Sequence, residues 1–73
     1  MTKFRGDIAS LKEIVAACRV RGEWRFIERN GLHQFQAATG ESLNWWPSTG
    51  TIMFQGGKKP ILATRFGHQI AAQ

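Results

Sequence analysis

The dipeptide Asn30-Gly31 constrains the fold of this chain more than any other feature of its sequence. It separates residues 23–29 from residues 32–38, two runs in which apolar and polar side chains alternate. Asn-Gly between alternating runs is the strongest short-range signal for a β-hairpin, because both residues tolerate the positive φ of a tight turn. We therefore expect two antiparallel strands in the middle of the chain.

A two-residue turn also predicts the register of this hairpin, because residues at equal distance from the turn face each other. The expected pairs are Arg29 with Leu32, Glu28 with His33, Phe26 with Phe35, and Trp24 with Ala37. The core-like face then carries Trp24, Phe26, Phe35 and Ala37. The opposite face is unusually rich in Arg and Gln, and it carries Arg25, Ile27, Arg29, Gln34 and Gln36.

A second hairpin is predicted from residues 43–46 and 51–55, around a turn at residues 47–50. If the turns preserve the alternation, Trp46 and Met53 join the core-like face. The Arg/Gln-rich face then gains Leu43, Trp45, Ile52 and Phe54. A slip of one residue would reverse this assignment.

A helix is predicted before the hairpins, because apolar residues recur there at spacings of three and four. These residues are Ile8, Leu11, Ile14, Val15 and Cys18. Ser10 with Glu13 fits a capping box, Asp7 is a competing N-cap, and Gly22 is expected to stop the helix.

A second helix is expected after Pro60, with Leu62, Phe66 and Ile70 four residues apart, although Gly67 weakens it. The predicted fold is therefore a single α+β domain over residues 1–73. It has a four-stranded antiparallel sheet in the order α-β-β-β-β-α.

Composition limits what can hold such a small domain together. The 73 residues include one cysteine, so no internal disulfide can form, and no Cys/His cluster has the spacing of a zinc site. A chain of this length buries only about 60% of its unfolded surface, so its stability depends on good packing, a partner or self-association. No targeting segment or apolar membrane span is visible, and we expect a cytoplasmic protein.

Ten Lys and Arg stand against five Asp and Glu, which gives a net charge of +5. This balance excludes an acidic mimic of nucleic acid and favours phosphate backbones or another anionic surface as the partner. The charge is unevenly spread along the chain. Residues 1–21 carry five basic and two acidic groups, residues 22–42 carry two and three, and residues 43–73 carry three and none.

The Arg/Gln-rich face predicts contact with nucleic acid, either a duplex, a hybrid or a single strand. The residues expected at this site are Arg25, Arg29, Gln34, Gln36, Trp45, Lys58 and Lys59. The cations would neutralise phosphates, the indole would stack on a base, and the glutamines would hydrogen-bond to base edges or backbone oxygens. The same side chains also fit an ordinary solvated sheet face. No cofactor is expected, and the Gly-Gly-Lys-Lys run at 56–59 could cradle a phosphate but lacks the spacing of a P-loop.

His33 is the only histidine in the predicted strands. Beside Glu28 it could act as an oriented general base, although an ordinary cross-strand pair explains the same arrangement. His68 has no predicted partner, and Cys18 is expected in the core as a small apolar side chain. The sequence contains no nucleophile–base pair, carboxylate dyad or metal spacing, so we expect binding rather than catalysis.

Residues 35–56 resemble a segment of the TATA-binding-protein-like N-terminal domain of ribonuclease HIII. The matching features are Phe35 and Ala37 on a strand, a glycine turn, a strand with an aromatic end, and an apolar strand that ends in Gln55-Gly56. The resemblance implies a curved sheet with helices on its convex side and a concave side that binds a hybrid or duplex. A short extra strand of that fold is either missing here or contained in residues 2–5. The catalytic ribonuclease domain is absent, so the resemblance implies binding without cleavage.

The first helix, the hairpin and the run Arg29-x-Gly31-x-His33 are similar to HicA-type messenger-RNA interferases, small basic toxins of double-stranded-RNA-binding-like fold. This similarity implies RNA cleavage with His33 as the catalytic residue. However, Leu32 stands where that family has Ser, and the apolar Pro-x-His stretch of the family is missing here.

The tryptophans also suit a protein-interaction or homodimerisation module. Trp45 and Trp46 are adjacent, so in a strand they point to opposite faces, and one is exposed unless both faces are covered. Exposed Trp beside Arg is typical of protein-binding hot spots. A dimer formed through the sheet face or an edge strand would also supply stability.

Overall fold

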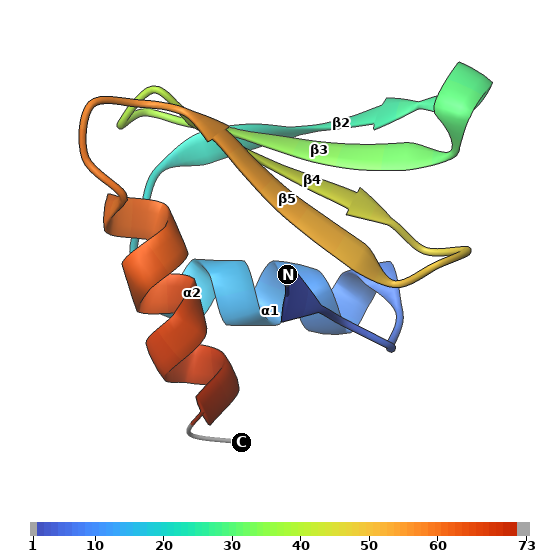
Figure 1. Cartoon of the computed structure of the whole chain (residues 1–73), viewed down its shortest axis with the longest axis horizontal. Coiled ribbons are helices and arrows are strands. Elements are labelled where there is room, and N and C mark those ends of the chain that lie inside the picture. Colours follow the sequence, from blue (N-terminus) through green and yellow to red (C-terminus); the bar gives the residue numbers. More distant parts are fainter. Residues whose placement is uncertain (1, 72–73) are drawn as a thin grey trace.

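The computed structural model describes residues 2–71 and contains one antiparallel sheet and two α-helices (Figure 1). In chain order the elements are β1 (Thr2–Lys3), α1 (Ile8–Ala17), β2 (Gly22–Ile27), the 3₁₀ turn η1 (Glu28–Asn30), β3 (Leu32–Ala37), β4 (Glu41–Trp46), β5 (Thr51–Gly56) and α2 (Ile61–Ala71). The strands lie in the order β1-β5-β4-β3-β2. The predicted α+β fold, with two helices flanking four antiparallel strands, is confirmed, and β1 adds a short fifth strand.

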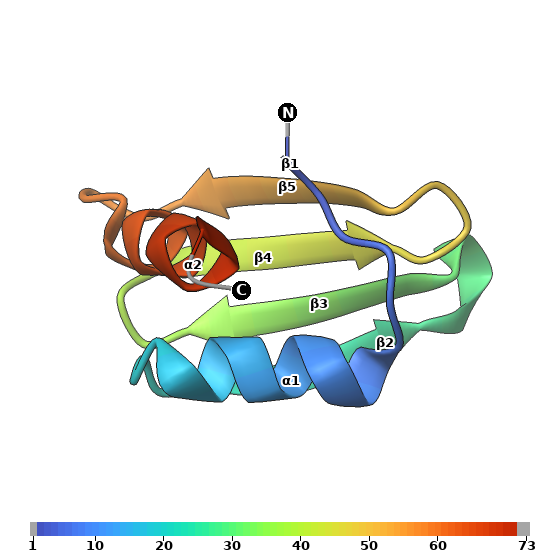
Figure 2. The same ribbon diagram turned by 90° about the horizontal axis from the view of Figure 1, so that it is seen from below.

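Both helices cover the same face of the sheet and leave the other face open (Figures 1 and 2). We call the covered side the inner face and the open side the outer face. In Figure 2, α1 lies along the β2 and β3 side of the sheet, and α2 lies on the β4 and β5 side. One covered face and one open face are what the alternating sequence of the strands requires.

Asp7, one of the two predicted N-caps, begins α1. Its carboxylate accepts a hydrogen bond from the Ser10 N–H at 2.8 Å, and this bond lowers the pKa of Asp7. The helix ends at Ala17, because Arg19 adopts a left-handed φ of 56° that cannot continue it. The prediction that Gly22 stops the helix is therefore wrong, since Gly22 begins β2.

The hairpin of β2 and β3 has the predicted faces but not the predicted register. Its turn contains η1 and closes on Gly31, whose φ of 60° is left-handed. The connection therefore spans residues 28–31, and Leu32 pairs with Ile27 rather than with Arg29. Because the shift is two residues, each side chain keeps the face on which it was expected.

The faces of β4 and β5 are the reverse of the predicted ones. Residues 38–40 connect β3 to β4, and this odd number shifts the alternation by one residue. Phe35 pairs with Leu43, which in turn pairs with Phe54. The inner-face residues of these two strands are therefore Leu43, Trp45, Ile52 and Phe54. The outer-face residues include Trp46 and Met53.

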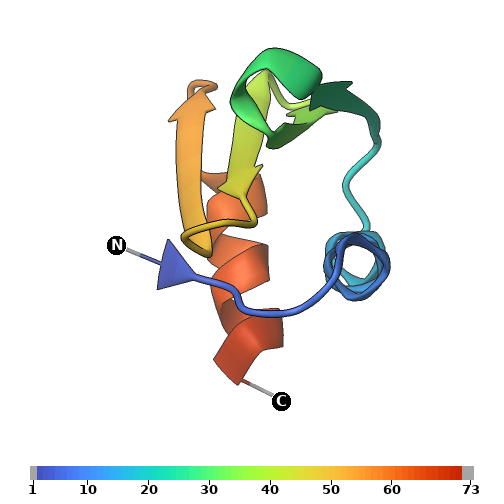
Figure 3. The same cartoon turned by 90° about the vertical axis from the view of Figure 1, so that its right-hand side faces the viewer.

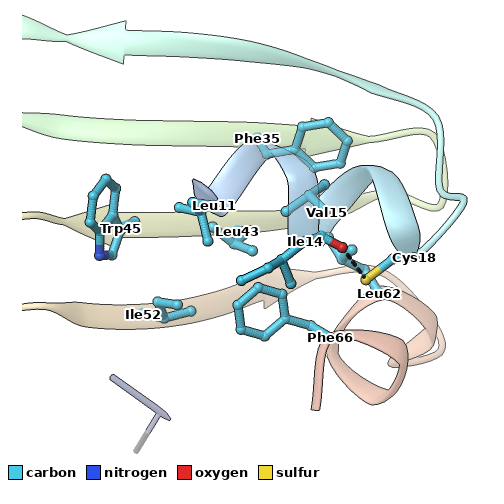
Figure 4. Close-up of a cluster of buried hydrophobic side chains, with 10 residues drawn as sticks. All are labelled: Leu11, Ile14, Val15, Cys18, Phe35, Leu43, Trp45, Ile52, Leu62 and Phe66. Carbon is cyan, nitrogen blue, oxygen red and sulfur yellow. Dashed lines mark hydrogen bonds between the residues drawn. The ribbon is translucent and has the colours of Figure 1, made fainter. Parts of the chain in front are cut away.

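Side chains from both helices and from β3, β4 and β5 form one hydrophobic core (Figure 4). The largest fully buried side chains are Trp45, Phe66, Leu11, Leu43, Leu62 and Val15. The predicted apolar stripe of α1 faces this core and includes Cys18, whose Sγ donates to the Ile14 carbonyl oxygen at 3.3 Å. The predicted second helix is confirmed as well, and its spacing of four residues is what buries one side of it.

Trp45 holds the N-terminal segment against the sheet. Its indole N–H donates to the Phe4 carbonyl oxygen at 3.1 Å, and the two rings lie edge to face with their centroids 5.6 Å apart. The Phe4 N–H donates to the Gly50 carbonyl oxygen at 2.7 Å, which extends the pairing of β1 with β5 by one residue. One buried side chain thus links the centre of the sheet to its first strand.

We expect Trp45→Phe to lower the free energy of unfolding by about 2–4 kcal/mol, because it leaves a cavity and removes the hydrogen bond to Phe4. Trp46→Phe, on the outer face, should cost less than about 1 kcal/mol. Urea unfolding of both variants, followed by circular dichroism, measures the two losses. Equal losses would mean that the faces of β4 are assigned wrongly.

Candidate nucleic-acid interface

Three of the residues predicted to bind nucleic acid lie together on the outer face. Arg25 pairs with Gln34 across β2 and β3, and Gln36 lies two residues further along β3. The Gln34 amide donates to Asn44 Oδ1 at 2.8 Å, and the Gln36 amide donates to Gln34 Oε1 at 3.3 Å. These hydrogen bonds join the side chains into one polar strip across the open face.

The prediction that Trp45 stacks on a ligand is wrong, because its side chain is only 2% exposed and faces the core. Trp46 takes its place on the outer face, at the end of β4 that adjoins Leu32. Leu32 is buried yet lies outside the core cluster, and it pairs with Ile27 on the same face. This end of the outer face is therefore apolar rather than basic.

The remaining predicted cations are split between the two ends of the sheet. Arg29 lies in η1, whereas Lys58 and Lys59 lie in the loop between β5 and α2, at the opposite end (Figure 1). The structure therefore does not bring Arg29 together with the two lysines.

The end of the sheet that carries the two lysines is built from three connections that touch one another. The Ala38 N–H donates to the Arg21 carbonyl oxygen at 2.7 Å, which places the α1–β2 connection beside the β3–β4 turn. The β3–β4 turn also lies against the β5–α2 loop, because Gly40 of the turn packs on Gly57 of the loop. Segments that are far apart in the sequence therefore form one surface.

Five exposed cations gather on this surface, which we call the basic end. Its members are Arg19, Arg21, Lys58, Lys59 and Arg65. Arg65 is held there by a hydrogen bond of 3.0 Å from its Nη1 to the Cys18 carbonyl oxygen, at the end of α1. Sequence reasoning did not assign the three arginines to a site, although the basic excess in residues 1–21 and 43–73 pointed to their segments.

Four of the five units of net positive charge lie at the basic end, where five cations stand against Glu41. Glu41 also lies there, but its side chain is only 3% exposed and is occupied by hydrogen bonds. The remaining five cations lie outside the basic end, and so do the other four carboxylates, which are Asp7, Glu13, Glu23 and Glu28. The rest of the surface is thus close to neutral.

The Glu41 carboxylate caps α2 from a neighbouring strand, β4. It accepts hydrogen bonds from the Leu62 N–H at 2.7 Å, the Thr39 hydroxyl at 2.8 Å and the Ala63 N–H at 3.2 Å. Burial by itself raises the pKa of Glu41, but these bonds to the charged form outweigh it and lower the pKa below its ordinary value. The negative charge also complements the dipole of α2.

Glu41 occupies the backbone amides of Leu62 and Ala63 at the N-terminus of α2, so these two amides are not free to bind a phosphate. The suggested phosphate cradle at residues 56–59 stays a prediction. Gly56 and Gly57 have φ angles of 74° and 77°, and a Cβ on Gly57 would lie 2.6 Å from the Glu41 side chain. The glycines let the loop pass over a buried carboxylate. Beside this loop the basic end has an open hollow of ≈ 680 Å³, which Lys58 and Lys59 help to line.

His33 lies on the inner face between two aromatic rings, with its ring centroid 4.7 Å from that of Phe26 and 5.5 Å from that of Trp45. It pairs with Phe26, so the predicted pair with Glu28 is wrong. Burial lowers the pKa of His33 below its ordinary 6.5, and the charge of Lys12 adds to this effect. Both effects favour the neutral imidazole.

Cys18 is a core side chain, as predicted, and burial raises the pKa of its thiol against a smaller opposite effect of Arg65. Within residues 2–71, no group of three His, Cys, Asp or Glu side chains is arranged to hold a metal ion. No helix in the part of the chain that the structure describes is long and apolar enough to cross a membrane.

Comparison with known proteins identifies no relative of this chain. No protein-family model matches the sequence, no curated protein matches it, and no solved structure matches its fold.

We expect Glu41→Gln to lower the free energy of unfolding by about 1–3 kcal/mol at pH 7, because the buried charge-assisted hydrogen bonds to α2 are weakened. Since the pKa of Glu41 is lower in the folded protein than its ordinary 4.5, this contribution is present above about pH 4.5 and is lost as the pH falls through the folded value. The difference between wild type and variant should therefore shrink below pH 4.5. Urea unfolding at pH 7 and pH 3 tests this, with the exposed Glu13→Gln as the control.

His33 should destabilise the fold at mildly acidic pH. Its folded pKa is lowered, so the unfolded chain binds more protons once the pH falls below about 6.5, and stability declines from there down to the folded value. His33→Gln should remove this decline, whereas His68→Gln, on the exposed side of α2, should retain it. Thermal unfolding between pH 5 and pH 7.5 measures the effect, and a decline that persists in His33→Gln would contradict it.

Proposed function

We propose that this protein binds nucleic acid without cleaving it, with the phosphate backbone held at the basic end. The observation that carries the proposal is that five exposed cations lie on one surface. Glu41, the carboxylate near them, is buried and hydrogen-bonded to α2. Phosphate neutralisation by clustered Lys and Arg supplies most of the affinity of proteins for nucleic acid. Anchoring by phosphates also positions the chain on its ligand.

The outer face next to the basic end offers hydrogen-bonding groups to sugars or bases. Gln36, Ser42 and Gln55 lie side by side across β3, β4 and β5 in the row nearest that end. Gln36 is also bonded to Gln34, so this row is linked to the polar strip that includes Arg25. A strand that passes along the basic end would therefore meet amide and hydroxyl groups rather than an aromatic platform.

The resemblance to the N-terminal domain of ribonuclease HIII supports this proposal. It implies helices on one face of the sheet and an open opposite face, with a short extra strand either missing or contained in residues 2–5. The chain has both helices on its inner face and the strand β1 at Thr2–Lys3.

Binding is proposed rather than cleavage because of the surroundings of His33. An interferase would need this imidazole beside an orienting group and open to its substrate. Here the ring packs between Phe26 and Trp45 on the face that the helices cover, and Glu28 lies in η1.

A salt titration with labelled oligonucleotides tests the proposal. We expect the logarithm of affinity to fall linearly with the logarithm of salt concentration between about 50 and 200 mM. Lys58→Ala/Lys59→Ala and Arg19→Ala/Arg21→Ala should each weaken binding and reduce the slope by about 2. Fluorescence anisotropy with a DNA duplex, an RNA/DNA hybrid and a single strand measures affinity and shows which form is preferred.

The matched control is Lys3→Ala/Arg29→Ala, which removes the same charge outside the basic end. It should leave the slope close to that of the wild type. Undetectable or salt-independent binding to all three ligands would contradict the proposal, and so would equal effects of the three double variants.

A further inference from the structure

Strand β2 lies at the edge of the sheet, and its free edge pairs with no other strand in the part of the chain that the structure describes. In an antiparallel ladder, alternate residues bond to the neighbouring strand and the others point away from it. The Ala38 N–H bonds to the carbonyl of Arg21, directly opposite in the register of β2 and β3. The N–H and C=O groups of Gly22, Trp24 and Phe26 therefore point towards the open edge.

We propose that two copies of this protein associate through this edge, with β2 running antiparallel to β2 of the second copy about a two-fold axis at Trp24. In this register Trp24 faces its own counterpart and Gly22 faces Phe26. The backbone N–H and C=O groups of all three residues point towards the free edge, as the hydrogen-bonded pairs of an antiparallel ladder require. The interface is isologous, so every contact occurs twice.

The charges on the outer face of β2 select this register. Glu23 and Arg25 flank Trp24, so each glutamate faces the arginine of the second copy and two ion pairs form. An axis shifted by one residue would place Glu23 against Glu23 or Arg25 against Arg25. Like charges directly opposite each other are destabilising, so the short sequence Glu-Trp-Arg is self-complementary only when its centre lies on the axis.

The inner face of β2 supplies the apolar part of the interface. Phe26 is 56% exposed, which is unusual for so large an apolar side chain. Its partner in the proposed register, Gly22, has no side chain and borders a groove of ≈ 470 Å³ that residues of α1 and β2 help to line. Figure 3 shows α1 end-on, on the side of the sheet below β2. The Phe35 ring fills the space that a Cβ on Gly22 would take. Phe26 of each copy would lie over Gly22 of the other, against this Phe35 ring, and enter the groove beside Val20 and Arg21.

This inference goes beyond nucleic-acid binding. It shares two residues with the proposed nucleic-acid surface, Arg21, which lines the groove beside β2, and Arg25, which belongs to the polar strip. The basic end contributes its cations from the α1–β2 connection, the β5–α2 loop and α2, whereas the dimer uses residues 22–26 of β2. Failure of one proposal would therefore not decide the other.

Charge reversal gives the sharpest test. Sedimentation equilibrium from about 5 to 500 μM should show the mass rising from 8.2 kDa towards twice that value. Glu23→Arg and Arg25→Glu, each alone, should raise the dimer dissociation constant at least about tenfold, because each sets like charges face to face twice. The double variant Glu23→Arg/Arg25→Glu should recover an affinity within about threefold of the wild type.

Recovery by the double variant is expected only if residue 23 faces residue 25 of the second copy. A wild-type mass of 8.2 kDa across the whole range would overturn the proposal. It would also be overturned if the single reversals left the dissociation constant unchanged, or if the double variant were no better than they are. Circular dichroism of each variant confirms that these exposed substitutions leave the fold intact.

The apolar half of the interface has its own control. Phe26→Ser should weaken the dimer, whereas Met53→Ser should not, although Met53 is 40% exposed on the outer face of β5. Equal effects of the two variants would indicate general apolar association instead of pairing through β2.

Discussion

The buried carboxylate of Glu41 at the N-terminus of α2 is the interaction on which the arrangement around the basic end depends. A charge so far removed from water is stable only when it is fully hydrogen-bonded, and here two backbone amides and a hydroxyl supply the donors. These bonds fix α2 against β4. They also require glycine in the β5–α2 loop, because a side chain on Gly57 would collide with Glu41. Because the carboxylate is engaged with α2, it pairs with none of the nearby cations in the part of the chain that the structure describes.

Local patterns predicted which segments form helices and strands, because periodicity reports which side of each element is buried. They could not predict how many residues each turn uses. Gly31 closes a four-residue turn, which shifted the first register by two residues and left its faces unchanged. The turn at residues 38–40 is odd in length, and for that reason Trp45 and Trp46 exchanged places. A one-residue error in the length of a turn therefore reverses the faces of the next strand, whereas a two-residue error leaves them unchanged.

The candidate site was harder to predict than the fold because it is not local. Arg25, Gln34 and Gln36 were grouped correctly, since alternation along one hairpin is enough to place them on a common face. The basic end joins three segments that only tertiary contacts bring together, such as the hydrogen bond from Arg65 to the end of α1. The uneven charge of the sequence indicated which segments carried the excess. It could not show that they meet.

The two proposed surfaces are compatible because the basic end lies beyond the first residue of β2, whereas the dimer would pair the free edge of that strand. The strand begins at Gly22, next to the basic end, and finishes at Ile27, next to η1. A two-fold axis at Trp24 reverses the strand, so the basic ends of two copies would lie at opposite ends of a joined sheet, and the repulsion between them would be weak. Pairing would also cover the exposed Phe26 of each copy, which matters for a chain with a small core and no disulfide. The sheet edge would thus supply the stability that 73 residues alone provide only in part, while the basic ends of both copies stay open.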